Sequence, residues 1–179
     1  MPDYRRAYQE GGTFFFTVVT YRRRPLLGDQ RAIDLLYECF EIVRGLHPFD
    51  TKALVVLPDH VHTIWTLPEG DADFPVRWKK IKASFSTRYF GPSAAVPQSV
   101  ADKGEKGIWQ RRYWEHAIRD QQDFNRHCDY IHYNPVKHGL VASPSDWRAS
   151  SFTEFVARGY YGGDWGRAAP GSILTMNFE

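Results

Sequence analysis

The sequence has 179 residues, of which 42% are hydrophobic, and a formal net charge of only +2, so it is long enough for one well-buried core and too short for two comfortable domains. It contains no apolar run near the roughly 20 residues of a membrane-spanning helix, no opening secretory signal, and two cysteines too far apart for a disulfide framework or a CxxC pair. We therefore expect a soluble, cytoplasmic protein.

Local patterns in the first half of the chain predict a strand, a helix and two further strands. Residues 13–21 are β-branched and aromatic, and they are apolar on both faces, which indicates a central strand. Residues 30–45 carry apolar side chains at helical spacing. Two short apolar strands follow at 52–57 and 60–67. The pair Pro58-Asp59 between them fits a tight hairpin turn.

The second half adds a helix, a loop, a strand and a last helix. Residues 75–90 have near-helical apolar spacing with a basic outer face. From 91 to 107 the composition turns to Pro, Ser, Ala and Gly, which indicates a surface loop. Residues 113–118 are a strand candidate, and Asp120 is a good N-cap for a helix that continues through Tyr133.

The order of these elements fits a split βαβ unit. We predict an α+β, ferredoxin-like domain whose antiparallel sheet has its helices packed on one face. Residues 1–141 form this domain in our interpretation. Residues 142–179 form a tail that is too aromatic to be disordered and is expected to pack back on the domain.

The charge is unevenly distributed along the chain. Between Phe74 and Ala101 there are five basic residues and no acidic one. Further basic clusters are Arg22 to Arg24 and the pair Arg111-Arg112. Any one cluster fits a solvated face, but three clusters interleaved with Trp and Tyr residues favour a polyanion whose bases can stack. This distribution favours nucleic acid as the partner.

His60 and His62 are the first residues that could carry chemistry. On a strand the i, i+2 spacing places both imidazoles on one face, with Val61 pointing into the core. Two polar rings on an otherwise apolar strand need partners, so the pair is either bound to a metal or hydrogen-bonded within the protein.

Tyr130 and Asn134 are the second candidates, because one helical turn separates them and they share a face of the last helix. An amide oxygen with two imidazoles makes an incomplete coordination shell that suits Mg²⁺ or Mn²⁺ acting on a phosphate, with the phenol as nucleophile. Seen alone, Tyr130 also fits a core residue, and Asn134 before Pro135 also fits a helix end.

Three stretches carry a family resemblance: VVLPDHVHTIWTLPEG at 55–70, WQRRYWEHAIR at 109–119 and DYIHYNPVKHGLV at 129–141. Together they resemble the REP-associated tyrosine transposases, which are domesticated relatives of the single-tyrosine HUH transposases. The similarity extends from YRR at 4–6 to VARGYY at 156–161 and so covers nearly the whole chain. The combination of LPDHVH with YIHYNPVKHG is far more specific than an isolated HxH.

The resemblance implies a role for each of the four site residues. His60 and His62 match the HUH metal pair, Asn134 matches the third ligand, and Tyr130 matches the nucleophile. Relatives in mobile elements usually have Gln at the position of Asn134, and the shorter side chain still offers an amide oxygen. The implied enzyme is a metal-dependent DNA transposase that uses Mg²⁺ or Mn²⁺ and forms a 5′-phosphotyrosine intermediate.

The resemblance also implies the substrate: repetitive extragenic palindromes, which are DNA hairpins flanked by a tetranucleotide and are cut and rejoined as single strands. By the same analogy Arg5 and Arg6 would help to read the tetranucleotide. The other expected DNA contacts are Arg22, Arg77, Lys79, Lys80, Lys82, Arg111 and Arg112. We expect the protein to act at the bacterial nucleoid, without a membrane, and as a monomer in preference to a homodimer.

Two other classes of function remain open at this point. A ferredoxin-like sheet with exposed aromatic residues could be a non-catalytic RNA- or DNA-binding module, although such a module has no need of the histidine pair. A metal-dependent phosphodiesterase could instead use His60 and His62 to activate water, leaving Tyr130 as a packing residue. A covalent protein–DNA adduct separates the second alternative from a transposase.

Overall fold

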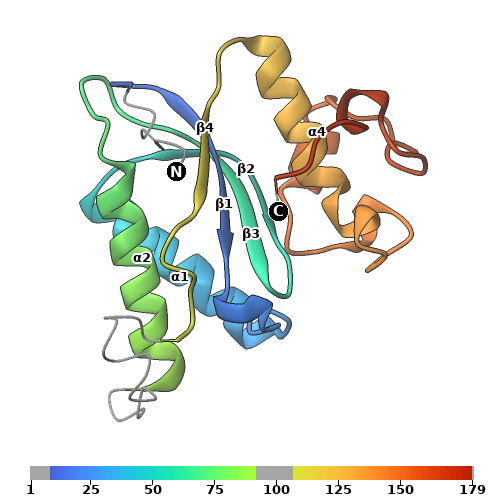
Figure 1. Ribbon diagram of the computed structural model, residues 1–179. Helices are drawn as coiled ribbons and strands as arrows, with labels where there is room; N and C mark the ends of the chain where they lie inside the picture. Colours follow the sequence, from blue (N-terminus) through green and yellow to red (C-terminus); the bar gives the residue numbers. More distant parts are fainter. Residues whose placement is uncertain (1–8, 92–106, 179) are drawn as a thin grey trace, which may run out of the picture.

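The computed structural model describes residues 9–91 and 107–178, which are built around a four-stranded antiparallel sheet (Figure 1). Its strands are β1 (Thr13–Val19), β2 (Asp50–Val56), β3 (His60–Thr66) and β4 (Trp114–Ala117). Their spatial order is β2-β3-β1-β4, so β3 lies between β1 and β2 and is antiparallel to both. This is the split βαβ arrangement.

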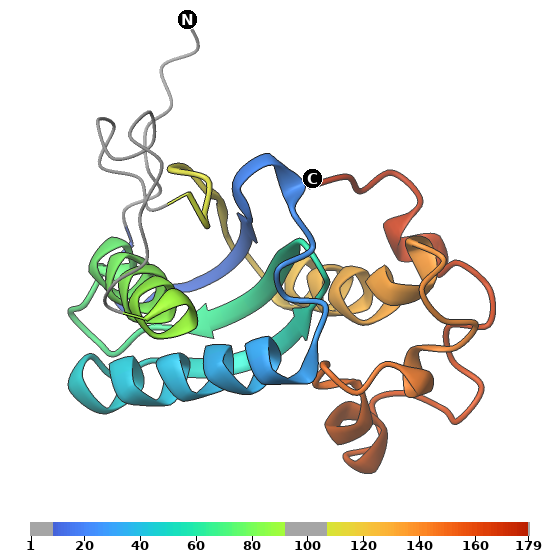
Figure 2. The same cartoon turned by 90° about the horizontal axis from the view of Figure 1, so that it is seen from below.

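Three long helices cover the sheet: α1 (Gln30–Leu46) and α2 (Phe74–Phe90) on one face, and α4 (Gln121–Lys137) on the other (Figures 1 and 2). Asp29 caps α1 by accepting a hydrogen bond from the Ala32 amide. Asp120 caps α4 in the same way through the Asp123 amide, as its sequence position predicts.

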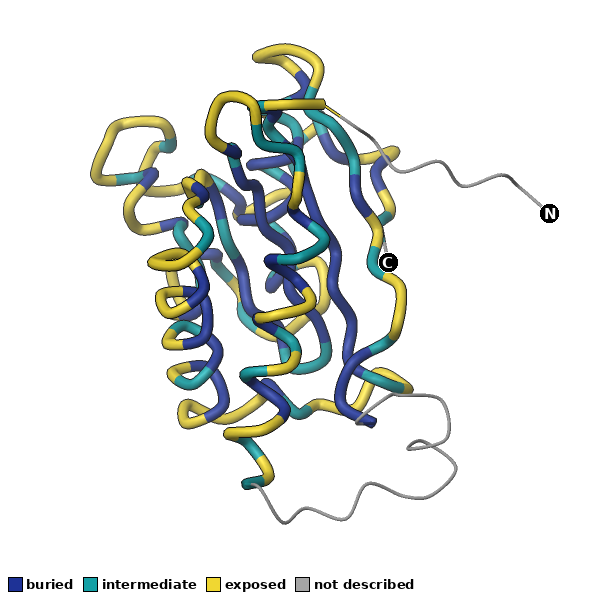
Figure 3. Tube along the Cα trace, turned by 90° about the vertical axis from the view of Figure 1, so that its left-hand side faces the viewer, coloured by how far each residue is buried: buried dark blue, intermediate teal, exposed yellow. Residues whose placement is uncertain are grey.

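The alternation of side chains along β1 explains why both faces are covered. Phe14 and Phe16 pack in the core beneath α1 and α2, whereas Phe15 packs in the core beneath α4. All three rings are fully buried, and the buried residues run along the strands and the inner sides of the helices (Figure 3). The sheet therefore forms the middle layer between two hydrophobic cores.

The predicted order of elements and the α+β fold class are confirmed. The prediction that the helices lie on one face is wrong, because α4 packs on the opposite face from α1 and α2. A central strand that is apolar on both faces needs cover on both, so the composition of β1 already required a second layer. Most of the loop predicted at 91–107 lies outside the described residues.

The segment after α4 packs on the same face as α4 (Figure 2). It contains three short helices, η2 (Pro144–Asp146), α5 (Phe152–Ala157) and η3 (Gly171–Ile173). It also covers the outer edge of β2, where the Val56 amide donates to the Ala149 carbonyl and the Ser151 amide donates to the Leu54 carbonyl.

The division of the chain at residue 141 stays a prediction. No helix of the described residues is long and apolar enough to cross a membrane.

Candidate active site on the α4 face of the sheet

Three residues singled out in the sequence, His60, His62 and Tyr130, lie together between β3 and α4, and Asn134 lies one helical turn after Tyr130 on α4. His60 and His62 share the α4 face of β3, and their ring centres are 4.7 Å apart. The Tyr130 ring, on α4, lies 5.2 Å from the His62 ring. The exposed fractions of His60, His62, Tyr130 and Asn134 are 1%, 0%, 1% and 0%. The fold thus buries two imidazoles, a phenol and an amide in one layer of the protein.

Hydrogen bonds fix one nitrogen of each imidazole and leave the other without a partner. Nδ1 of His60 lies 2.6 Å from a carboxylate oxygen of Asp59, and Nδ1 of His62 lies 2.9 Å from the hydroxyl of Thr17. The Nε2 atoms of both rings are buried without a hydrogen-bond partner, as are both polar atoms of the Asn134 amide. Buried polar atoms normally have partners, so three such side chains in one layer fit a bound cation.

The protonation states of this layer also suit a cation. Burial lowers the pKa of His62 well below its usual value, and the neighbouring His60 and Lys137 lower it further. His62 is therefore neutral, which is the form that binds metals. Burial of Asp59 opposes its ionisation, but hydrogen bonds from His60 and Arg23 lower the pKa of this carboxyl below its ordinary value. Asp59 is therefore ionised, and its carboxylate contacts Nδ1 of His60.

Replacing Asp59 with Asn is expected to weaken the apparent affinity for Mn²⁺ by about 10- to 100-fold, because the outer partner fixes the orientation and basicity of a ligand histidine. The measurement is a Mn²⁺ titration of the melting temperature, because a cation that binds only the native state stabilises it. Asp50→Asn changes an exposed carboxyl on β2 and serves as the matched control. Equal Mn²⁺ titrations for the wild type and Asp59→Asn would show that Asp59 does not act through His60.

Two donors surround the Tyr130 phenol oxygen. The ammonium of Lys137, seven residues along α4, lies 3.3 Å from it, and the backbone amide of Phe178 also lies 3.3 Å away. The same ammonium is 4.9 Å from the centre of the Tyr130 ring. Both donors would stabilise negative charge on the phenol oxygen. The position of Lys137 beside the phenol was not anticipated from the sequence.

Two further histidines, His132 in α4 and His138 at its C-cap, differ in their surroundings. Both nitrogens of His132 have partners, the Tyr161 hydroxyl at 3.0 Å and the Ser151 hydroxyl at 2.8 Å. Burial lowers the pKa of His132 to about 3, so the ring is neutral and ties α4 to the segment that follows it. The His138 ring is 5.3 Å from the His60 ring, at the edge of the site.

A second group, formed by His116, Asp123 and His127, could also hold a metal ion, since its ligand atoms lie within 4.8 Å of one another. In the structure, however, one Asp123 oxygen is 2.8 Å from Nε2 of His116 and also accepts hydrogen bonds from the backbone and side chain of Arg119. Burial alone would raise the pKa of Asp123. The hydrogen bonds with His116 and Arg119 have the larger effect and hold this pKa well below its usual value. The permanently charged guanidinium of Arg119 contacts this Asp123 oxygen and competes with a metal ion for it. The sequence interpretation missed this group, whose members come together only when β4 meets α4.

Asp123→Ala is expected to destabilise the protein by about 1–3 kcal/mol, because it leaves charged donors without their acceptor at the start of α4. Guanidinium unfolding measures this loss. His116→Ala is expected to leave the rise in melting temperature on addition of Mn²⁺ unchanged. Loss of that rise in His116→Ala, with metal-free stability unchanged, would place the ion in this second group.

The prediction that Arg77 contacts DNA is wrong. Its side chain is only 2% exposed, and its guanidinium forms a two-pronged ion pair with Asp71 at 2.6 and 3.0 Å. It also donates to the carbonyls of His47, Pro48 and Asp73. Arg77 therefore links the start of α2 to neighbouring loops. Its guanidinium is buried in these bonds and is not available to bind a phosphate.

The other predicted DNA contacts have different surroundings. Lys79 and Lys80 are exposed on α2. Lys82 is half-buried, and its ammonium donates to the carbonyls of Gln110 and Arg111, so it holds the segment before β4. The remaining described residues of the set, Arg22, Arg111 and Arg112, are exposed. Arg5 and Arg6 lie outside the described residues.

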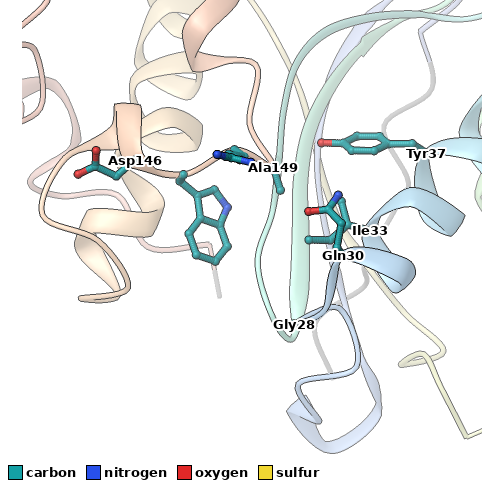
Figure 4. Close-up of a pocket in the computed structure, with 8 residues that line it drawn as sticks. Gly28, Gln30, Ile33, Tyr37, Asp146 and Ala149 are labelled. Carbon is teal, nitrogen blue, oxygen red and sulfur yellow. The ribbon is translucent and has the colours of Figure 1, made fainter.

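Two cavities differ in their relation to the site. One of about 250 Å³ lies between the start of α1 and residues 146–149, and its walls include Tyr37 and Asp146 (Figure 4). None of the four site residues lines it. The other, of about 410 Å³, is lined by Thr17, Val19, Gln110, Arg112, Tyr113, Trp114, Asn177 and Phe178. It adjoins the site, because Thr17 contacts His62 and Phe178 contacts Tyr130.

A ferredoxin-like sheet with an HxH pair on a central strand, faced by a helix that carries Tyr and Asn one turn apart, has the layout expected of a single-tyrosine HUH nuclease. No family model matches the chain. It is 47% identical to the Escherichia coli REP-associated tyrosine transposase over 92% of this chain and 91% of that protein. A Haemophilus influenzae protein assigned to the same family is 40% identical over 93% and 94%.

A solved structure of a REP-associated tyrosine transposase bound to a REP hairpin has a TM-score of 0.78 and 46% identity, covering 95% of this chain and 94% of that one. The chain belongs to the REP-associated tyrosine transposases.

Proposed function

We propose that this protein cuts and rejoins single-stranded DNA at hairpins of the REP type through a covalent 5′-phosphotyrosine at Tyr130. The observation that carries the proposal is the burial of unpartnered His60, His62 and Asn134 polar atoms in the layer that holds the Tyr130 phenol. The relative that was solved with a REP hairpin supports the substrate class.

His60, His62 and Asn134 would hold the metal, since each offers a buried polar atom without a hydrogen-bond partner. Imidazole nitrogens with an amide oxygen leave positions for water and phosphate, which suits Mg²⁺ or Mn²⁺. When bound, the cation acts as a Lewis acid that neutralises charge on the scissile phosphate. Asp59 and Thr17 would orient the two histidines by fixing Nδ1 of each ring.

The covalent step exchanges one phosphoester bond for another. The Tyr130 oxygen loses its proton and forms a bond to phosphorus while the bond from phosphorus to the 3′ oxygen breaks. The leaving 3′ oxygen takes up one proton, so the products are a 5′-phosphotyrosine and a free 3′-OH with no net change in protons. Lys137 stabilises the attacking oxygen through its contact with the phenol. Attack by a second 3′-OH reverses the step and rejoins the strand without ATP, because the bond energy is conserved.

The proposed working form is a monomer that acts on nucleoid DNA. An exposed strand edge is a template for pairing with a second copy. Here the outer edge of β2 is paired with residues 149–151 of the same chain, which removes one such edge. Sedimentation at working concentrations tests this form.

Binding is expected to require a hairpin with a single-stranded flank and to weaken steeply with salt. The joint substitution Lys79→Gln with Lys80→Gln should reduce the slope of log affinity against log salt by roughly 1.4–1.8 if both lysines contact phosphates. Fluorescence anisotropy at several salt concentrations measures the slope, with exposed Lys52→Gln as control. Equal affinity for a blunt duplex and the flanked hairpin would contradict single-strand recognition.

A further inference from the structure

Four nearly parallel aromatic rings pack together beside the nucleophile, and the position of the Phe178 ring among them is called the slot below. The Phe178 ring lies 4.7 Å from the Trp114 ring at 24° and 5.1 Å from the His127 ring at 13°. The His116 ring is stacked 4.7 Å from His127 and lies at 7° to Trp114. Phe178 therefore packs against one flat side chain from β4, Trp114, and one from α4, His127.

The sheet register places this slot next to the active site. Trp114 pairs with Thr17 across β4 and β1, and Thr17 pairs with His62 across β1 and β3. Residues in one cross-strand row share a face, so Trp114 lies two strand spacings from His62, roughly 10 Å. The Phe178 ring is also edge-on to the Tyr130 ring at 5.0 Å. An occupant of the slot thus touches the phenol that attacks the DNA.

The cavity next to the slot is lined by flat, polar and cationic residues. It has a volume of about 410 Å³, and its lining includes Trp114 and Phe178 together with Gln110, Asn177 and Arg112. Trp114 is 37% exposed, although it is the largest type of side chain. Aromatic faces stack on bases, amides bond to base edges, and guanidinium binds phosphate.

We propose that this slot holds one unpaired nucleobase of the DNA strand next to the phosphate attacked by Tyr130, with Trp114 as its stacking platform. In this structure the Phe178 ring occupies the position of the base. The inference rests on the proposed function and adds a substrate subsite to it. Trp114 acts as a positioning residue, because a base held against it fixes the adjoining phosphate before the phenol.

The direct test uses hairpins that carry 2-aminopurine, a fluorescent base, at successive positions of the single-stranded flank. The protein is Tyr130→Phe, so that binding is read without cleavage. At one flank position the fluorescence is expected to fall on binding, as it does when this base stacks. The additional change Trp114→Ala should abolish that quenching, whereas Trp114→Tyr should restore it. Tyr160→Ala, which removes another exposed aromatic ring, should leave it unchanged.

A second experiment measures the rate of DNA cleavage in proteins that keep Tyr130. Removing the base at the same flank position should slow cleavage by the wild type by roughly 5- to 150-fold, the usual effect of losing one stacked base. In Trp114→Ala, cleavage should be slowed to a similar level, and removing the base should then have little additional effect. Circular dichroism and anisotropy check that the variant is folded and binds the hairpin.

Quenching that persists in Trp114→Ala, or equal cleavage of all flanks by the wild type and Trp114→Ala, would overturn the base slot and leave the transposase chemistry intact. Absence of any adduct with the wild type would instead contradict the proposed function. The fluorescence arm needs no cleavage, so it decides on the slot in either case.

Discussion

Replacing His60 or His62 with Ala is expected to reduce DNA cleavage by roughly 10³-fold or more, because each change removes a ligand of the proposed cation, which would contribute several kcal/mol of charge stabilisation. Each ring offers a buried Nε2 without a hydrogen-bond partner, and Nδ1 is already fixed. Hairpin binding should be largely kept, since phosphate contacts elsewhere supply most of the affinity.

A readout independent of cleavage is the effect of metal on stability. Mn²⁺ should raise the melting temperature of the wild type, because a ligand that binds only the native state stabilises it. The same addition should have little effect on His62→Ala. A His62→Ala protein that cleaves DNA with the Mn²⁺ dependence of the wild type would contradict the proposed site.

Tyr130→Phe is expected to lose all cleavage and all covalent adduct while keeping the fold, the metal and the affinity for DNA. The change removes one oxygen, which accepts hydrogen bonds from the Lys137 ammonium and the Phe178 backbone amide. Denaturing electrophoresis with a labelled hairpin measures both products. Because tyrosine stays joined to the DNA after attack, the adduct is the signature of this mechanism.

Tyr133→Phe is the matched control for this experiment. Tyr133 lies on the same helix but is half-buried against the residues after α4, near Gly166. We expect this variant to remain active. Cleavage without an adduct in Tyr130→Phe would favour a phosphodiesterase that activates water, and an adduct that persists there would move the nucleophile to another residue.

Much of the fold was predictable because each element carries its own local signal. Asp120 marks the start of α4 by the short polar side chain of an N-cap, and the aromatic run of β1 marks a central strand. The placement of helices on the two faces was not predicted, because it depends on which side chains of β1 meet which helix. Arg77 was misread for a similar reason: its place in a basic stretch does not reveal its ion pair with Asp71.

The candidate site was predictable where spacing alone sets geometry. His60 and His62 share a strand face, and Tyr130 and Asn134 are one helical turn apart. The partners that orient the histidines were missed. Thr17 reaches His62 only through the register of β1 with β3, which no local pattern shows. Phe178 reaches Tyr130 from the far end of the described chain, which only the tertiary fold reveals.

The most direct test of the central claim is to locate the attachment point of the DNA by mass spectrometry. Wild-type protein is incubated with a flanked hairpin and Mn²⁺, denatured, and digested with nuclease and trypsin. Cleavage after Arg126 and Lys137 releases a peptide with two tyrosines, Tyr130 and Tyr133, which fragmentation distinguishes. A 5′-nucleotide on Tyr130 is the predicted result. A nucleotide on any other residue, or cut DNA with no modified peptide, would contradict the phosphotyrosine mechanism.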